Sequence, residues 1–139
     1  MKKSVKRDFT LPQSCDEVWR ALTNRVSLAE WMYPNDFEPR VGHRFTFQVP
    51  PNPKVKFEGL IVNCEVLKCD PPNELSFTWV AGGIDTRVEY RLESSGGGTR
   101  VRFEQYGFEN DQDNAYHGAA YGWAHMHGKW IKLLAKETA

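Results

Sequence analysis

The chain has 139 residues, 40% of them hydrophobic and 26% charged, which excludes a disordered chain. Eighteen basic residues balance eighteen acidic ones, so net charge favours neither nucleic acid nor an anionic membrane as a partner. A chain of this length fits one domain and buries roughly 70% of its unfolded surface. We therefore expect a single domain, residues 1–139, with a real core.

The N-terminus and the cysteines indicate the compartment. The opening residues MKKSVKRDFTLP are basic but lack the apolar run of a signal peptide, and nowhere do ~18 consecutive apolar residues occur. The cysteines Cys15, Cys64 and Cys69 lack the paired spacing of a zinc site, which suits a reducing compartment. We expect a cytoplasmic protein without membrane insertion, in which the cysteines are small core or surface residues.

The first elements in chain order are a strand and two short helices. The β-branched and aromatic residues of VKRDFTLP predict a strand near residues 4–11. The basic residues at its start are interpreted as a solvated strand end: Lys2, Lys3, Lys6 and Arg7. Ser14 can cap a short helix together with Glu17, three positions later. A second helix, SLAEWM, is expected to begin with Ser27 as its cap and to stop before Pro34.

Between residues 43 and 106 the hydrophobic pattern has a period of two. The segments RFTFQV, ELSFTWV, TRVEYRLE and TRVRFEQ each alternate apolar with polar residues. This alternation is typical of antiparallel strands with one covered face and one face in water, and DPPN and SSGGG suit the turns between them. The segment FEGLIVNCEVLK is apolar on both faces, so the sequence leaves its orientation open. A strand follows SSGGG, which favours a turn over a phosphate-binding loop.

The stretch YHGAAYGWAHMHGKWIKLLAKE predicts a long helix, and acidic residues suited to a helix start precede it. At about 100° per residue, seven residues gather on one arc: Tyr116, Ala119, Trp123, Met126, Trp130, Leu133 and Leu134. The opposite side carries His125, Lys132 and Lys136. We expect the apolar arc to cover the dry face of the sheet.

The histidines of this helix do not have the spacing of a metal site. His125 and His127 are two positions apart, so they point to nearly opposite faces and cannot share a metal. We predict no metal and no cofactor. His125 is expected to face water, whereas His127 falls on the apolar arc beside Trp123 and Trp130. Two interpretations of His127 stay open: a core imidazole satisfied by a hydrogen bond, and a polar group that faces a ligand.

Several motifs recur in a familiar order: VWRALT, LAEWMYP, GHRF, Gly59, PPNELSFTW, GGTRVRF, the GF at Gly107 and the GW at Gly122. In this order, over about residues 7–134, the chain resembles the family of activator of heat-shock-protein-90 ATPase homologue-like proteins, within the START-like (SRPBCC) superfamily. The resemblance implies an α+β helix-grip fold: a curved antiparallel sheet of six to seven strands wrapped around a long C-terminal helix, with two short helices after the first strand. It also implies a hydrophobic cavity between helix and sheet.

Two departures from the family pattern, WMY before the proline and GH before the next strand, place Met32 and His43 where they would reshape the cavity mouth. Chaperone-activating members of the family carry a separate N-terminal domain, for which 139 residues are expected to leave no room. Chaperone activation is therefore not inferred from the family name.

We expect a protein that binds a small apolar or amphipathic molecule between the last helix and the sheet, because large aromatic walls with few polar groups typically line such sites. The expected lining residues are Trp31, Phe45, Phe47, Trp79, Tyr90, Phe103, Tyr116, Trp123, His127 and Trp130. One alternative is a cyclase or dehydratase-type enzyme that uses His127 as acid or base in the same cavity. Another is a protein that assists a chaperone or self-associates through a surface that includes Tyr121. No nucleophile triad or carboxylate pair occurs in the pattern, so no catalytic residue is predicted.

Overall fold

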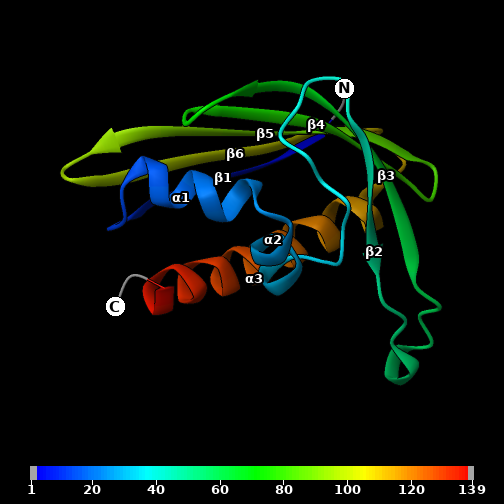
Figure 1. Ribbon diagram of the computed structural model, residues 1–139. Coiled ribbons are helices and arrows are strands. Elements are labelled where there is room, and N and C mark those ends of the chain that lie inside the picture. Colours follow the sequence, from blue (N-terminus) through cyan, green and yellow to red (C-terminus); the bar gives the residue numbers. More distant parts are fainter. Residues whose placement is uncertain (1–2, 138–139) are drawn as a thin grey trace.

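The computed structural model of the protein describes residues 3–137. Six strands form one antiparallel sheet in the order β1-β6-β5-β4-β3-β2. The strands are β1 (Lys3–Leu11), β2 (Arg44–Val49), β3 (Leu60–Asp70), β4 (Glu74–Ala81), β5 (Ile84–Ser95) and β6 (Gly98–Phe108). Figure 1 shows the sheet as a curved layer with the helices on its concave side, and β2 and β3 bending down beside the long helix. The α+β helix-grip architecture implied by the resemblance is confirmed.

Two short helices follow the first strand, as expected. Helix α1 (Cys15–Thr23) begins with the predicted capping box, in which Ser14 and Glu17 bond each other's backbone N–H groups. Helix α2 (Arg25–Trp31) ends before Pro34, but it begins two residues before the predicted Ser27 cap. The expected cap was wrong because Asn24 takes that role: its side chain accepts hydrogen bonds from the N–H groups of Val26 and Ser27.

The alternating segments form the expected hairpins, with turns at DPPN between β3 and β4 and at SSGGG between β5 and β6. The segment FEGLIVNCEVLK, whose orientation the sequence leaves open, contributes most of β3, and its Val62, Cys64 and Val66 are buried. A 3-10 turn, η1 (Pro53–Val55), lies at the tip of the β2–β3 hairpin. Gly98 starts β6 against β1, where a Cβ atom would come within 2.1 Å of the Leu11 carbonyl oxygen. Only glycine fits there without movement of the backbone.

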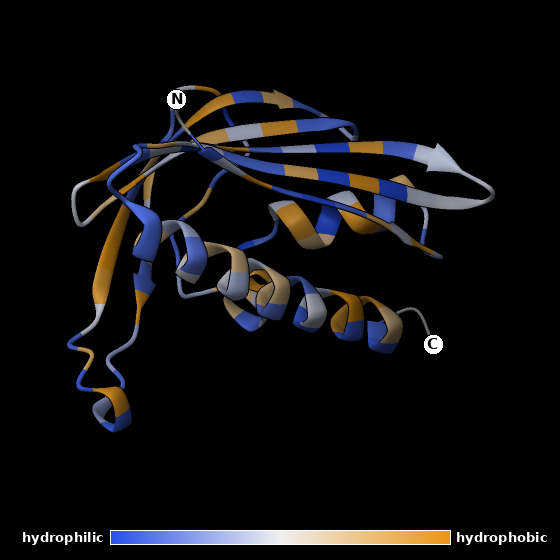
Figure 2. Cartoon of the chain, turned by 180° about the vertical axis from the view of Figure 1, so that it is seen from behind, coloured by the Kyte–Doolittle hydropathy of each residue, from blue (hydrophilic) through white to orange (hydrophobic). Residues whose placement is uncertain are grey.

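Helix α3 (Asp113–Glu137) runs across the concave side of the sheet and packs against α1, α2 and β1. Its buried face consists of Trp123, Met126, His127, Trp130 and Leu134, which confirms the apolar arc in part, since Tyr116, Ala119 and Leu133 are only half-buried. The opposite side is exposed at His125, Lys132 and Lys136, as predicted. Figure 2 shows this alternation of hydrophobic and hydrophilic residues along the helix and strands. Between residues 3 and 137, no helix is long and apolar enough to cross a membrane.

Candidate functional site

The ten residues predicted to line a cavity all belong to the hydrophobic core or pack against it. A continuous series of ring contacts joins nine of them, with Trp31 stacked on Trp130 at 4.7 Å between ring centroids. Tyr116 is the exception, because its ring contacts Phe108 and His117 instead. The residues therefore form one packed aromatic cluster between α3 and the sheet.

Open hollows lie elsewhere on the molecule. Three of them, of about 690, 410 and 290 Å³, are lined mainly by charged and polar residues of the strands. No residue of α3 lines any of these three. Between helix and sheet, aromatic side chains occupy the space that the resemblance assigns to a cavity.

A chain of three polar side chains crosses this aromatic cluster. The Arg7 Nε donates a hydrogen bond to Nδ1 of His127 at 2.9 Å, and Nε2 of His127 lies 2.9 Å from the Tyr90 hydroxyl. His127 is 0% exposed and Tyr90 is 1% exposed. The rings of Phe9, Phe103 and Trp123 surround the imidazole at centroid distances of 4.8–5.6 Å. A polar connection therefore runs from the edge strand β1 through the core to β5.

The direction of these hydrogen bonds follows from Arg7. A guanidinium can only donate, so Nδ1 of His127 accepts and the imidazole carries its proton on Nε2. That proton is donated to the Tyr90 hydroxyl oxygen. Burial lowers the pKa of His127 to about 3, and the positive charge of Arg7 lowers the pKa in the same direction. Burial also raises the pKa of Tyr90 well above its usual value, so both groups are neutral over the ordinary pH range.

The sequence leaves two interpretations of His127 open. Its surroundings fit the core imidazole satisfied by hydrogen bonding, although it makes two hydrogen bonds and not one. Next to it, Trp130 is also 0% exposed, and its Nε1 has no hydrogen-bond acceptor within the described residues. An unsatisfied buried donor is uncommon and calls for a physical explanation.

A second buried polar chain supports the helix closer to its N-terminal half. Trp123 donates from Nε1 to the Gln105 side-chain oxygen at 2.6 Å, and the Gln105 amide donates to the Thr86 hydroxyl at 2.9 Å. Thr86 in turn donates to the Trp79 carbonyl oxygen. All of these side-chain groups are satisfied, so this chain fixes the helix against β4, β5 and β6.

The burial of α3 changes along its length. The half that contains Met126, Trp130 and Leu134 is closed over, whereas Tyr116 and Ala119 remain half-buried although they lie on the same arc. Trp79, which contacts Trp123 at 5.1 Å between ring centroids, is also half-buried. The cluster is therefore least covered at the N-terminal half of the helix, and we call Trp79, Tyr116 and Ala119 the mouth.

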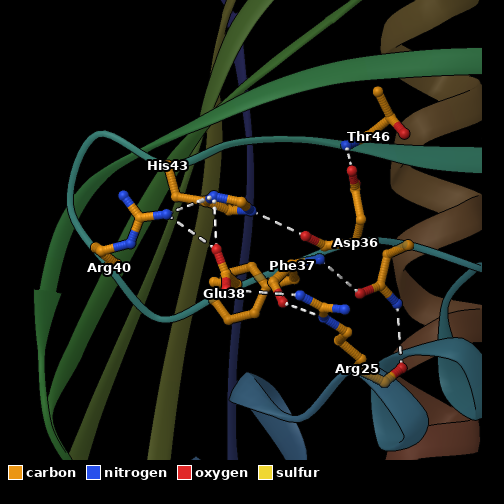
Figure 3. Close-up of polar contacts among 8 residues, drawn as sticks. Arg25, Asp36, Phe37, Glu38, Arg40, His43 and Thr46 are labelled. Carbon is orange, nitrogen blue, oxygen red and sulfur yellow. Dashed lines mark hydrogen bonds and ion pairs between the residues drawn. The ribbon is translucent and has the colours of Figure 1, made fainter.

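An irregular segment, residues 32–43, covers the core between α2 and β2, and Figure 3 shows the polar contacts that hold it. Phe37 is 2% exposed and meets Phe45 edge to face. The His43 Nε2 donates to the Asp36 carbonyl oxygen at 2.9 Å, and its Nδ1 lies 3.0 Å from Glu38. His43 thus fastens this covering segment, and Met32, its first residue, is buried.

The structure corrects the interpretation of the basic N-terminal cluster. Lys6 is exposed and Lys3 forms an exposed ion pair with Asp113, but Arg7 faces inward. Lys2 lies outside the described residues. The signal that could have placed Arg7 is its register with Val5 and Phe9, since alternate residues of a strand share one face.

The helix histidines lie as predicted, with His125 exposed and His127 buried. Among residues 3–137, no three His, Cys, Asp or Glu side chains are grouped in a way that could hold a metal ion. The three cysteines are free, with Cys64 buried and Cys15 and Cys69 partly buried. They are small core and near-surface residues, as expected.

Solved structures similar to this chain share its whole architecture. MLL2253 from Mesorhizobium loti is 34% identical, with a TM-score of 0.88 over 96% of this chain and 98% of that one. CalU16 from Micromonospora echinospora is 23% identical, with a TM-score of 0.78 over 99% and 79%. DynU16, a protein in the dynemicin biosynthetic locus, is 20% identical, with a TM-score of 0.80 over 95% and 47%. The last two likenesses show the fold alone.

No match is found among curated proteins. The sequence does match the family model described as Activator of Hsp90 ATPase homolog 1-like protein, over residues 13–135. That range contains both short helices, five of the six strands and nearly all of α3. With MLL2253 similar over almost its full length, the chain belongs to the family of Activator of Hsp90 ATPase homolog 1-like proteins.

Proposed function

We propose that the protein binds a small apolar or amphipathic molecule between α3 and the concave face of the sheet. The observation that carries this proposal is the polar chain Arg7–His127–Tyr90 inside an otherwise aromatic cluster. Ligand sites of this kind combine apolar walls with a few convergent polar groups.

A core that served stability alone would gain little from this chain. Well-packed apolar side chains of similar volume are often as stabilising as a buried polar network, or more so. Beside this network, the Nε1 donor of Trp130 has no acceptor within the described residues. A bound molecule with an oxygen acceptor would explain both the polar chain and the unsatisfied Trp130 donor beside it.

In this proposal the molecule reaches the cluster at the mouth, where the cluster is least covered. Trp79, Tyr116 and Ala119 are only half-buried, and a Cβ atom added at Gly122 on the same part of α3 would meet nothing within 4 Å. A ligand would enter there and move the rings it replaces. Burial of apolar ligand surface contributes about 25 cal/mol per Å² before the cost of association, which is sufficient for binding at micromolar level.

The geometry favours binding over proton transfer at His127. Nδ1 accepts from Arg7 and Nε2 donates to Tyr90, so neither nitrogen is available to a reacting group in this arrangement. The low pKa of His127 also keeps it neutral. Tyr121 is 78% exposed, as the interaction alternative requires, but a single exposed ring does not define an interface.

The test uses two tryptophan substitutions on one helix. Ala119→Trp fills the mouth, whereas Ala124→Trp adds the same ring on the exposed side. We expect fatty acids, polyketide-like aromatics or sterols to quench tryptophan fluorescence and to shift the indole N–H resonances of Trp79 and Trp123. Ala119→Trp should weaken that binding by about tenfold or more, and Ala124→Trp should not.

The proposal is wrong if no compound of the panel shifts the indole resonances of the wild-type protein. It is also wrong if Ala119→Trp, with an unchanged melting temperature, binds as tightly as Ala124→Trp. Heteronuclear NMR spectra of both variants establish that each is folded.

A further inference from the structure

We propose that the molecule bound at this site is an apolar monocarboxylic acid whose carboxylate pairs with Arg7. This inference rests on the proposed function and identifies the chemical class of the ligand. It follows from the charge and hydrogen-bonding state of one inward-facing arginine.

Arg7 differs from Arg100, the other half-buried arginine of the described residues. Arg100 is half-buried and binds Asp8 with two hydrogen bonds of 3.0 and 2.6 Å. Arg7 is half-buried too, but within the described residues it has no carboxylate partner, and its one hydrogen bond goes to the neutral His127. The fold therefore turns a positive charge toward the aromatic cluster without a counter-charge.

An anion would complete this arrangement. A guanidinium stays charged at every ordinary pH and has five N–H donors, of which Arg7 uses one. Partial removal of a charge from water is costly without a partner. The planar fork of the remaining donors matches the two oxygens of a carboxylate.

Two more donors lie in the same neighbourhood. Trp130 has an Nε1 without an acceptor within residues 3–137, and the Tyr90 hydroxyl accepts from His127, which leaves its own proton to donate. The Phe9 ring contacts three of these groups. The Arg7 guanidinium lies over it at 5.6 Å, and the ring also contacts His127 and Trp130. Among the residues that the structure describes, the site offers these donors and no carboxylate, so it selects a ligand that supplies oxygen acceptors.

The surroundings define the rest of the ligand. One arginine balances one negative charge, which favours a carboxylate over a phosphate dianion. From Arg7 to the mouth, the path past His127 is lined by the aromatic rings of Phe103 and Trp123, so the body attached to the carboxylate must be apolar.

The experiment compares acids with neutral molecules of the same shape. The probes are decanoic acid and naphthoic acid, each paired with its primary alcohol, decanol and naphthylmethanol. For the wild-type protein we expect each acid to bind about tenfold more tightly than its alcohol, since a hydrogen bond to a charged group contributes more than a neutral one. Calorimetry gives the dissociation constants, and the Trp130 indole N–H resonance should shift with the acid alone.

The matched variants are Arg7→Gln and Lys6→Gln, because Lys6 directly precedes Arg7 in β1 and is exposed on the opposite face of the sheet. Both remove one positive charge. Arg7→Gln should abolish the preference for the acid while the alcohol still binds, and Lys6→Gln should leave the preference unchanged. Arg7→Lys, which keeps the charge but not the fork, should retain part of it.

The outcomes separate this inference from the proposed function. Equal binding of acids and alcohols by the wild-type protein, without a shift of the Trp130 indole resonance, would overturn the inference and leave the proposed function intact. Binding of neither class would remove the proposed function and the inference together. Should Arg7→Gln fail to fold, the wild-type comparison and Arg7→Lys still decide the matter.

Discussion

His127 holds a neutral imidazole where water does not reach it, and this state has a thermodynamic consequence. Burial lowers its pKa to about 3 in the folded protein, whereas an exposed histidine in the unfolded chain has a pKa of about 6.5. The unfolded chain therefore binds a proton between these two pH values and the folded protein does not. Stability contributed by the neutral state is complete above about pH 6.5 and decreases as the pH falls toward 3.

We expect the free energy of unfolding to fall by about 2 kcal/mol from this source between pH 7 and pH 5, from the linkage relation. Urea unfolding at both pH values measures the change. His127→Gln should remove most of the decrease, since the amide can still accept from Arg7 and donate to Tyr90 but does not titrate. His125→Gln, an exposed change on the same helix, should keep the wild-type decrease, and an equal decrease in His127→Gln would contradict the assignment.

At the residue scale the sequence predicts positions better than partners. The helical period placed His127 on the apolar arc, and the structure confirms its burial. Its partners Arg7 and Tyr90 come from strands 120 and 37 residues away in the chain. No local pattern contains such pairings, because they depend on the register of β1 and β5 with the helix.

At the scale of elements, α3 contains glycines where packing does not require them. A Cβ atom at Gly118 or Gly122 would meet nothing within 4 Å, so neither glycine serves a close approach to the sheet. Each glycine in a helix interior lowers helix stability by about 1 kcal/mol relative to alanine. The helix is thus less stable in its N-terminal half, where its apolar face is also least covered.

Gly118→Ala should raise the free energy of unfolding by about 0.5–1 kcal/mol, measured by chemical denaturation. Gly98→Ala provides the contrast, because its Cβ atom would collide with the Leu11 carbonyl oxygen at the start of β6. That variant should lose about 2 kcal/mol or more. A destabilising effect of Gly118→Ala would contradict the conclusion that a methyl group fits at this position without a clash.

Most elements could be predicted from local chemistry. The capping box fixed the start of α1, and the alternation of apolar residues located β2, β4, β5 and β6. The start of α2 was missed because Asn24 and Ser27 are both good caps, and the choice between them depends on how α2 packs after α1. The orientation of β3 could not be predicted, since a segment apolar on both faces carries no alternation.

At the scale of the whole molecule, the covering segment 32–43 is held differently from the sheet. Two buried side chains, Met32 and Phe37, and several partly exposed polar contacts fasten it, whereas the central strands are paired on both sides. Segments with few buried apolar contacts open locally at a lower free energy than the core.

Hydrogen exchange should therefore be faster at the Thr46 and Gln48 amides, which bond to Asp36 and Pro34 of this segment, than at Tyr90 or Phe103. Glu38→Gln should accelerate these two amides by a factor of about two to five, because exposed ion pairs contribute modestly. The equivalent change at the far end of the sheet, Glu93→Gln, should leave them unaffected. Equal exchange in all parts of the sheet would show that the segment does not open separately.

The family and the helix-grip arrangement could be predicted from the order of motifs, but the filling of the interior could not. The same aromatic residues can surround a space or occupy it, and only their mutual distances distinguish the two. Here the stacking of Trp31 on Trp130 and the contacts around Phe103 show the rings packed together.

The pairing of β1 with β6 joins Lys3 to Phe108 and Leu11 to Thr99, which has a consequence for biosynthesis. A nascent chain leaves the ribosome with its N-terminus first, so β1 is made long before the strand that it must bond. Until residues 98–108 have been translated, β5 lacks one of its two neighbours in the sheet and β1 lacks its one neighbour. Native assembly therefore has to wait until β6 has been made, and a polypeptide stalled before that point exposes strand edges prone to aggregation.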